Sequence, residues 1–170
     1  MTSFTSQHTL KRLLANLAKV GGTAILLLWF CGNSLSAQET YLDTFSSISY
    51  SNNDGTLDFS GSWIESGDDN DPDDGRIRIR DGRLRFRDID ERSISRTLDL
   101  SRATEVVLTL DYERTDGDER LAVELFDGSN WNRIASLQGE GSLSYTLTAS
   151  ERSPSAGIRF RSDSGSWSNG

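Results

Sequence analysis

The chain has 170 residues with 18 basic and 26 acidic side chains, which gives a net charge of −8 at neutral pH. This acidic balance argues against general nucleic-acid binding, because such binding depends on neutralising phosphate groups. The length suits one ordinary domain, and a single cysteine excludes an internal disulfide as a source of stability.

The first 37 residues have the pattern of a secretory signal peptide. A positively charged region and an apolar run, residues 21–31, precede a stretch of small residues that ends at Ala37. The apolar run is too short to span a bilayer comfortably. We therefore predict a signal-peptide helix that is cleaved after Ala37, with a retained N-terminal anchor as the alternative. The protein is then exported, secreted or located at the cell surface, and its mature domain is residues 38–170.

Cleavage at this point would change the chemistry that the chain can perform. It removes His8, Cys31 and both lysines, so the mature chain has 15 arginines against 26 acids and a net charge of −11. Without histidine and cysteine, neither a Ser-His-Asp triad nor a Cys-His pair can form, and zinc loses its preferred ligands. We therefore predict that the protein is not an enzyme. The catalytic chemistry that the composition still allows is that of paired carboxylates, as in glycoside hydrolases.

Short segments in which apolar and polar residues alternate follow the leader. They lie at residues 41–45, 56–59, 62–65, 75–87, 93–98, 105–112, 120–126, 131–137, 143–147 and 157–161. A period of two is typical of strands, and turn-forming residues separate the segments. No mature segment has a long apolar stripe with helical spacing. The pattern predicts an all-β fold, an antiparallel sandwich of two sheets.

Residues 75–87 read GRIRIRDGRLRFR and predict a hairpin with Asp81 and Gly82 as its two-residue turn. The apolar side chains then share one face, and the other face carries arginines in three facing pairs, which are Arg76 with Arg87, Arg78 with Arg85, and Arg80 with Arg83. Facing like charges destabilise a sheet. We interpret this face either as a charge ladder with neighbouring acids or as a groove for an anionic glycan. The candidate ligand-binding residues are Arg78, Arg80, Arg83 and Arg85.

An acidic loop, residues 68–75, precedes the hairpin and reads DDNDPDDG. Closely spaced carboxylates suit calcium, which takes oxygen ligands, and the candidate ligands are Asp68, Asp69, Asp71 and Asp73. An EF-hand register fails, because Asp74 stands where that loop needs glycine. The alternative is a solvated loop, or one that folds over the arginine face.

Trp131 is a candidate platform for stacking against a sugar ring. It follows a turn that begins with Asp127 and Gly128. The alternative is packing within its own hairpin, since a tryptophan buries a large apolar surface when it packs against neighbours.

Ordered sequence cues along the mature chain extend these predictions. They are Asp43-Thr44-Phe45, Asn53-Asp54-Gly55-Thr56, Gly61-Ser62-Trp63 with Glu65, residues 82–86, Leu98-Asp99-Leu100-Ser101, Leu110-Asp111-Tyr112, Asp127-Gly128 with Trp131, and residues 157–161. In this order they resemble a family of secreted bacterial jelly-roll domains, similar to concanavalin A-like and MAM-type sandwiches. The resemblance covers nearly all of the mature chain. It implies a jelly-roll β-sandwich that serves as a non-catalytic module for adhesion or glycan binding.

The same resemblance implies two further features. In related sandwiches an acid of the first strand often joins an acid of the last strand around calcium, which makes Asp43 another candidate ligand. The chain ends before the last strand of that family, so we expect a C-terminally truncated domain with unpaired backbone groups at an edge or slot. Such a domain should be poorly stable or should associate.

The predicted function is that of a non-catalytic extracellular binding module within a larger surface or secreted protein, for carbohydrate binding or adhesion. The expected partners are anionic or neutral glycans and neighbouring domains of the parent protein, with calcium as the expected cofactor and no nucleic acid. The alternatives are a structural spacer without a ligand and a glycosidase-like sandwich.

Overall fold

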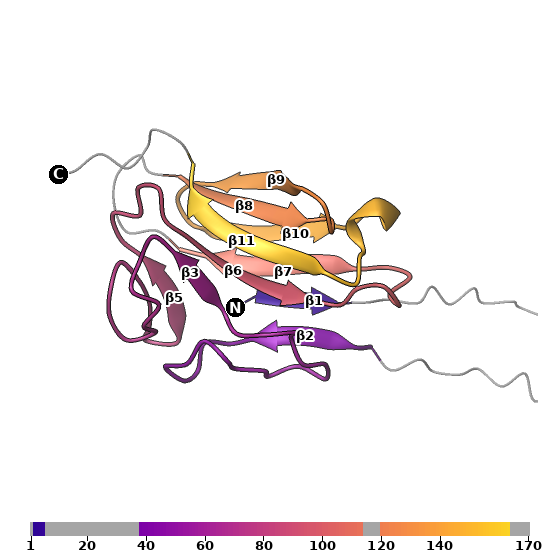
Figure 1. Ribbon diagram of the computed structural model, residues 1–170, viewed down its shortest axis with the longest axis horizontal. Coiled ribbons are helices and arrows are strands. Elements are labelled where there is room, and N and C mark those ends of the chain that lie inside the picture. Colours follow the sequence, from indigo (N-terminus) through magenta and orange to yellow (C-terminus); the bar gives the residue numbers. More distant parts are fainter. Residues whose placement is uncertain (1, 6–37, 114–119, 164–170) are drawn as a thin grey trace, which may run out of the picture.

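A computed structural model describes residues 2–5, 38–113 and 120–163. Within these ranges the protein has eleven strands and one short 3-10 helix. Every strand pairing is antiparallel. The strands form two larger sheets and a separate two-stranded hairpin, so the protein is an all-β sandwich (Figure 1).

The first sheet has four strands in the order β10, β7, β1 and β2. These strands are β1 (Thr2–Thr5), β2 (Thr40–Asp43), β7 (Val107–Tyr112) and β10 (Gly141–Thr146). β1 lies between β2 and β7 and pairs with each of them along its whole length. The N-terminal segment therefore holds a central place in this sheet.

The second sheet has five strands in the order β3, β6, β11, β8 and β9. These strands are β3 (Ile64–Ser66), β6 (Ser93–Leu98), β8 (Leu121–Phe126), β9 (Trp131–Leu137) and β11 (Ala156–Ser162). β11 is the middle strand, with β6 and β8 on its two sides.

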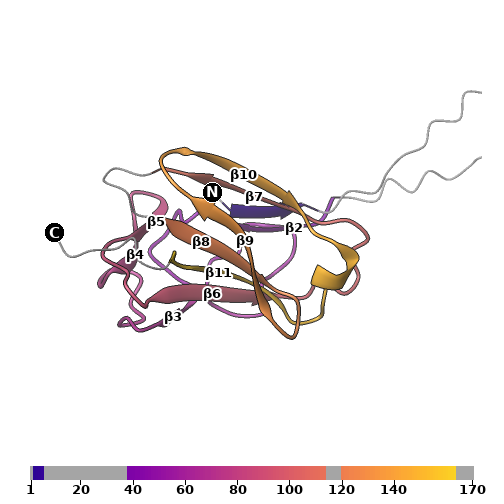
Figure 2. The ribbon, with the colours of Figure 1, turned by 90° about the horizontal axis from the view of Figure 1, so that it is seen from above.

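The remaining two strands, β4 (Ile77–Arg80) and β5 (Arg83–Phe86), pair only with each other. Figures 1 and 2 show this hairpin at one end of the sandwich and the 3-10 helix η1 (Ala149–Glu151) at the other. The hairpin and η1 therefore lie on separate surfaces of the sandwich.

Apolar side chains from both sheets fill the space between them. β7 buries Leu108 and Leu110, and β11 buries Ile158 and Phe160, at alternate positions in each strand. Alternation is expected when one face of a sheet packs against a core and the other meets solvent. Burial of each such side chain contributes about 1.5–3 kcal/mol, which makes this layer the main support of the fold.

Residues 56–59 are a loop, so the prediction of a strand there is wrong. The backbone N–H groups of Asp54 and Leu57 donate to carbonyl groups of β2 at 2.8 and 3.0 Å. Gly55 permits this close approach, because a Cβ at that position would lie 2.1 Å from the carbonyl oxygen of Thr40. The loop thus covers the outer edge of β2 without adopting strand geometry.

The other predicted strands are confirmed, with ends that agree within two residues.

The predicted signal peptide, residues 1–37, lies outside the described residues except for β1. No helix in the described ranges is long and apolar enough to cross a bilayer. The C-terminal truncation with its open edge or slot stays a prediction, and in the described residues β1 lies between β2 and β7. The jelly-roll connectivity stays a prediction.

Candidate functional site

The β4–β5 hairpin forms as its sequence predicts. Asp81 and Gly82 have φ values of 54° and 69°, the left-handed conformation that a type I′ two-residue turn requires. The register is the predicted one, with Arg78 opposite Arg85 and Arg80 opposite Arg83. Local turn chemistry therefore determines which arginines face each other.

The apolar face of the hairpin packs against the core. Ile77 is 0% exposed and Ile79 is 2% exposed, while Leu84 and Phe86 are partly buried against the same cluster. The ring centroid of Phe86 lies 5.9 Å from that of Phe160 in β11. Because successive side chains of a strand point to opposite faces, this anchoring directs the arginines toward solvent.

Most of the hairpin arginines have a carboxylate partner. The pairs are Arg76 and Arg87 with Asp88, Arg83 with Glu113, and Arg85 with Asp81. These pairs are solvent exposed, and exposed ion pairs stabilise a fold only weakly. Arg78 and Arg80 form no ion pair with any residue that the structure describes.

Asp68 secures the start of β4. Its Oδ2 atom accepts hydrogen bonds from the backbone N–H groups of Arg76 at 2.7 Å and Ile77 at 2.8 Å. The backbone N–H of Ile79 donates to the carbonyl oxygen of Pro72 at 2.7 Å, so the acidic loop runs along β4. The loop thereby supplies partners to backbone groups that would otherwise form an open strand edge.

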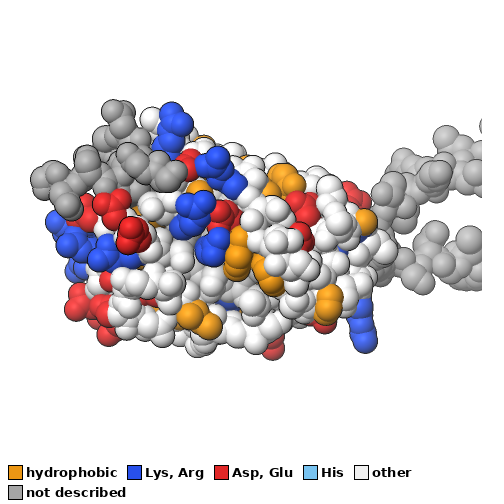
Figure 3. Space-filling model, turned by 45° about the horizontal axis from the view of Figure 1, so that its top comes forward, with side chains coloured by type: hydrophobic (Ala, Val, Ile, Leu, Met, Phe, Trp, Pro, Cys, Tyr) orange, Lys and Arg blue, Asp and Glu red, His pale blue; other side chains and the backbone are white. Residues whose placement is uncertain are grey.

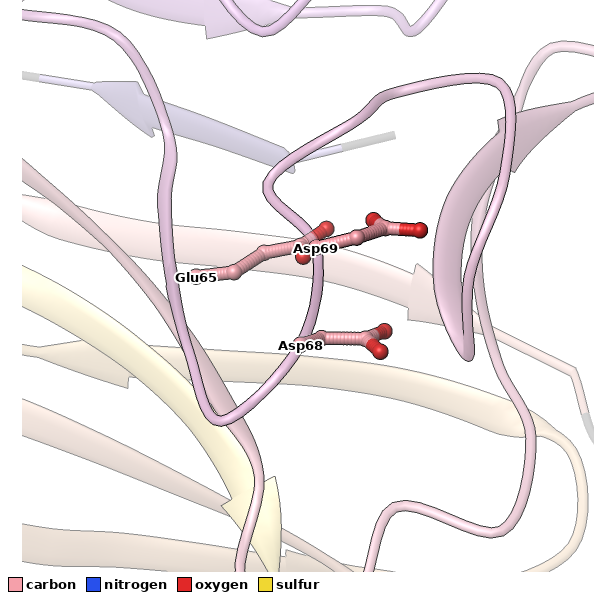
Figure 4. Close-up of side chains that lie close together, drawn as sticks. All are labelled: Glu65, Asp68 and Asp69. Atoms are coloured by element: carbon pink, nitrogen blue, oxygen red, sulfur yellow. The ribbon is translucent and has the colours of Figure 1, made fainter.

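Three carboxylates, from Glu65, Asp68 and Asp69, converge where β3 meets this loop (Figure 4). One oxygen from each residue lies within 4.8 Å of the others. Asp68 and Asp69 are predicted metal ligands, whereas sequence reasoning missed Glu65. A signal for Glu65 exists, because it lies two residues after the buried Trp63 and therefore shares its strand face.

Glu65 links β3 to both the loop and the hairpin. Its Oε1 atom lies against the hydroxyl of Tyr50, and its Oε2 atom accepts from the backbone N–H of Asn70 at 2.7 Å. The Tyr50 hydroxyl also lies 2.9 Å from the carbonyl oxygen of Ile77, so one hydroxyl proton faces two acceptors. Burial raises the pKa of Glu65 and the pKa of Tyr50. If Glu65 carried a proton, its O–H would donate to the Tyr50 hydroxyl oxygen, and the Tyr50 O–H would then donate to the carbonyl oxygen of Ile77.

The other predicted metal ligands of the loop lie outside this acid group. Asp69 accepts from the backbone N–H of Asp71 at 3.0 Å, and Asp71 accepts from that of Asp73 at 3.0 Å. Such bonds to the backbone two residues further on stabilise turns. Of the five predicted ligands, the structure brings only Asp68 and Asp69 into one group within the described ranges.

Asp43 lies in the core and is fully buried. Its carboxylate accepts hydrogen bonds from Phe45 N, from Trp63 Nε1 and from a terminal nitrogen of Arg96, each at 2.9 Å. The side chain of Arg96 is 0% exposed as well. The cation beside Asp43 in this structure is therefore a guanidinium group, and calcium at Asp43, which the family resemblance implies, stays a prediction.

Arg96 connects the two sheets through the core, because it lies on β6 and its partner Asp43 lies on β2. Its guanidinium carbon lies 3.9 Å from the ring centroid of Phe59, and its Nε donates to the carbonyl oxygen of Gly61 at 2.8 Å. Burial raises the pKa of Asp43 and lowers the pKa of Arg96, while their attraction opposes both shifts. Sequence reasoning missed Arg96, although it shares the apolar strand face of Ile94.

Trp131 lies at the other end of the sandwich from the hairpin. The turn before it packs against the segment that follows η1, because a Cβ on Gly128 would lie 2.9 Å from Ser153 Oγ. The Trp131 ring centroid lies 4.2 Å from the guanidinium carbon of Arg159, which in turn pairs with the buried Glu124. The structure therefore does not bring Trp131 together with the predicted arginine site (Figures 1 and 2).

Charged side chains are unevenly distributed on the surface. Figure 3 shows basic side chains gathered over one half of the visible face, interspersed with acidic ones. Alternation of the two signs is the arrangement expected where arginines and carboxylates neutralise each other.

Comparisons with known proteins identify no relative of this chain: no family model, no curated protein and no solved structure matches it.

Proposed function

We propose that the protein is an exported, non-catalytic binding module that takes an anionic glycan on the arginine face of the β4–β5 hairpin. The observation that carries this proposal is the incomplete neutralisation of that face. Four of the six arginines in residues 76–87 share three carboxylates, those of Asp81, Asp88 and Glu113, and Arg78 and Arg80 pair with no acid in the described residues. An anionic ligand would supply Arg78 and Arg80 with the partner that no described acid provides.

Two properties of the hairpin support this role. Ile77 and Ile79 fix its apolar face in the core, and Asp68 holds the backbone at the start of β4. The arginines therefore project from a rigid base, which lowers the entropic cost of binding. A guanidinium group also pairs bidentately with carboxylate or sulfate oxygens, the groups that uronate and sulfated polysaccharides carry.

The proposal gives the two unpaired arginines the leading part. Arg78 faces Arg85 and Arg80 faces Arg83 across the hairpin, so a ligand anion near either pair meets two guanidinium groups. Trp131 belongs to a different surface and has no part in this site.

Retention on a column of immobilised uronate or sulfated polysaccharide tests the proposal. The double variant Arg78→Gln with Arg80→Gln should elute at clearly lower salt than the unchanged protein. Each variant position loses an ion pair between a guanidinium group and a carboxylate or sulfate of the glycan, and salt screens the pairs that remain. The matched control, Arg102→Gln with Arg133→Gln, removes the same charge from two exposed arginines outside the hairpin. Equal elution of both double variants would contradict a hairpin site, and no retention of the unchanged protein would favour the spacer alternative.

Calcium stays a prediction for the group formed by Glu65, Asp68 and Asp69. Hard oxygen ligands in close proximity suit this ion, but every member of the group also accepts a hydrogen bond from the protein. Calorimetric titration of the folded chain with calcium decides the matter. Heat that disappears in an Asp69→Asn variant would support the prediction, and absence of heat in the unchanged protein would contradict it.

A further inference from the structure

β1 holds a central position in the first sheet although it is remote in sequence from both of its neighbours. Thr2–Thr5 pairs antiparallel with β2 on one side and with β7 on the other. The chain then passes through residues 6–39 before β2 begins. A hairpin turn joins two strands that are close in sequence. β1 is remote in sequence from both β2 and β7, so no such turn connects it to either neighbour.

This strand belongs to the segment that the predicted cleavage after Ala37 would remove. β2 has no other strand partner in the described residues, and the loop that contains Asp54 and Leu57 covers its second edge. Without β1, the facing edges of β2 and β7 would present unpaired N–H and C=O groups. Such groups require partners.

The slot between β2 and β7 defines the kind of segment that fits. Both neighbours run antiparallel to β1, so one extended segment of a single polarity satisfies both edges. One position of the slot lies beside the buried Tyr41 and Leu108, and the position two residues away lies beside the buried Asp43 and Leu110. Because Asp43 already has Arg96 as its cation, both inward positions call for uncharged residues.

We propose that this slot is a strand-acceptor site, that its occupant is the N-terminal segment Thr2–Thr5 of the same chain, and that removal of the leader opens it. The precursor is then a complete sandwich, and the processed domain carries an open slot. In strand addition of this kind, main-chain hydrogen bonds supply the affinity and alternate side-chain positions supply the selectivity.

Amide hydrogen exchange on the full chain tests the proposal directly. Ser3→Pro removes a backbone donor from the middle of β1, whereas the matched control Gln7→Pro lies outside that strand. Ser3→Pro should speed exchange in residues 40–43 and 107–112 by about tenfold or more, with β6 and β11 unaffected, because only the slot opens. Unchanged exchange in β2 and β7, or an equal effect of Gln7→Pro, would overturn the proposal.

A second experiment answers the same question if Ser3→Pro disturbs the whole fold. A specific protease site is inserted after Ala37 in the full chain, the folded protein is cut, and the leader is separated from it. Exchange in β2 and β7 should rise after cutting and fall again when a synthetic peptide of residues 1–8 is added. A peptide with proline at position 3 should have no effect. Unaltered exchange after cutting would overturn the proposal, as would a dimer of the cut domain that protects both strands, because a second copy would then be the occupant.

Discussion

Arg96 in the core and Arg78 on the hairpin carry the same guanidinium group in opposite environments. Arg96 is enclosed between the two sheets, pairs with Asp43 and lies over the ring of Phe59. Arg78 lies on the solvent side of the hairpin and has no ion-pair partner in the described residues. The first arginine is committed to the fold, whereas the second is available to a ligand.

The difference between these two regions lies in the cost of losing a partner. In the core, removal of one charge leaves the other buried and uncompensated. On the hairpin, water solvates a guanidinium group that lacks an acid, so its loss costs little stability. Substitutions at the core pair should therefore lower the free energy of unfolding, whereas substitutions of the hairpin arginines should change ligand binding and leave that free energy nearly unchanged.

Arg96→Met should have the largest effect on stability. It leaves the carboxylate of Asp43 buried without its cation, and breaking a buried pair in this way costs about 3–5 kcal/mol. Urea denaturation measures the loss. The matched control Arg78→Met should change the free energy of unfolding by about 0.5 kcal/mol or less, and similar losses in both variants would remove the distinction between the regions.

Asp68→Ala should have the next largest effect, because it removes the acceptor of the backbone N–H groups of Arg76 and Ile77. Leaving such donors without a partner costs about 1–3 kcal/mol. Asp73→Ala, an exposed change in the same loop, serves as the control in thermal unfolding. Equal melting temperatures for the two variants would show that Asp68 does not secure the hairpin.

Gly82→Ala should destabilise the fold by about 1 kcal/mol, because an L-residue in the left-handed region is strained. Gly82 has a φ of 69° and an open surrounding, so backbone strain is the sole cause to be expected. The control Gly61→Ala also enters open space, at a position without a left-handed φ. If both changes had the same effect on the free energy of unfolding, the type I′ turn would not be the source of the hairpin register.

Glu65→Gln should have the smallest effect at neutral pH, about 1 kcal/mol or less, since an amide can still bond to Tyr50. Burial raises the pKa of Glu65 in the folded protein. The contribution of this carboxyl group is therefore fully present below its unfolded pKa and is lost as the pH rises through its folded pKa. Relative to Glu65→Gln, the unchanged protein should lose stability between acid and neutral pH in urea titrations. A constant difference across that range would contradict the raised pKa.

Much of the fold could be predicted because strand signals are local. The alternation in residues 105–112 predicts the buried positions Leu108 and Leu110 that β7 shows. The same reasoning fails at residues 56–59, because the close approach of Gly55 to β2 holds them as a loop. Such an approach depends on a neighbour that is remote in sequence.

The candidate site was predicted less completely than the fold. The facing arginines follow from the Asp81–Gly82 turn, and the structure confirms their register. The contact between Glu65 and Tyr50 and the position of Trp131 away from the hairpin were not predicted. These features depend on contacts between separate strands and loops. The spacing of residues within one strand does not indicate which other elements it contacts.

By itself, the sequence determined the strand period, the two-sheet class of fold and the arginine register, because neighbouring residues and turn conformations settle these properties. Only the tertiary structure decided that Asp43 meets Arg96, 53 residues away, and that Thr2–Thr5 lies between β2 and β7. The physical reason is that buried charges and open strand edges must find partners somewhere in the folded chain. Which partner they find depends on how the sheets pack.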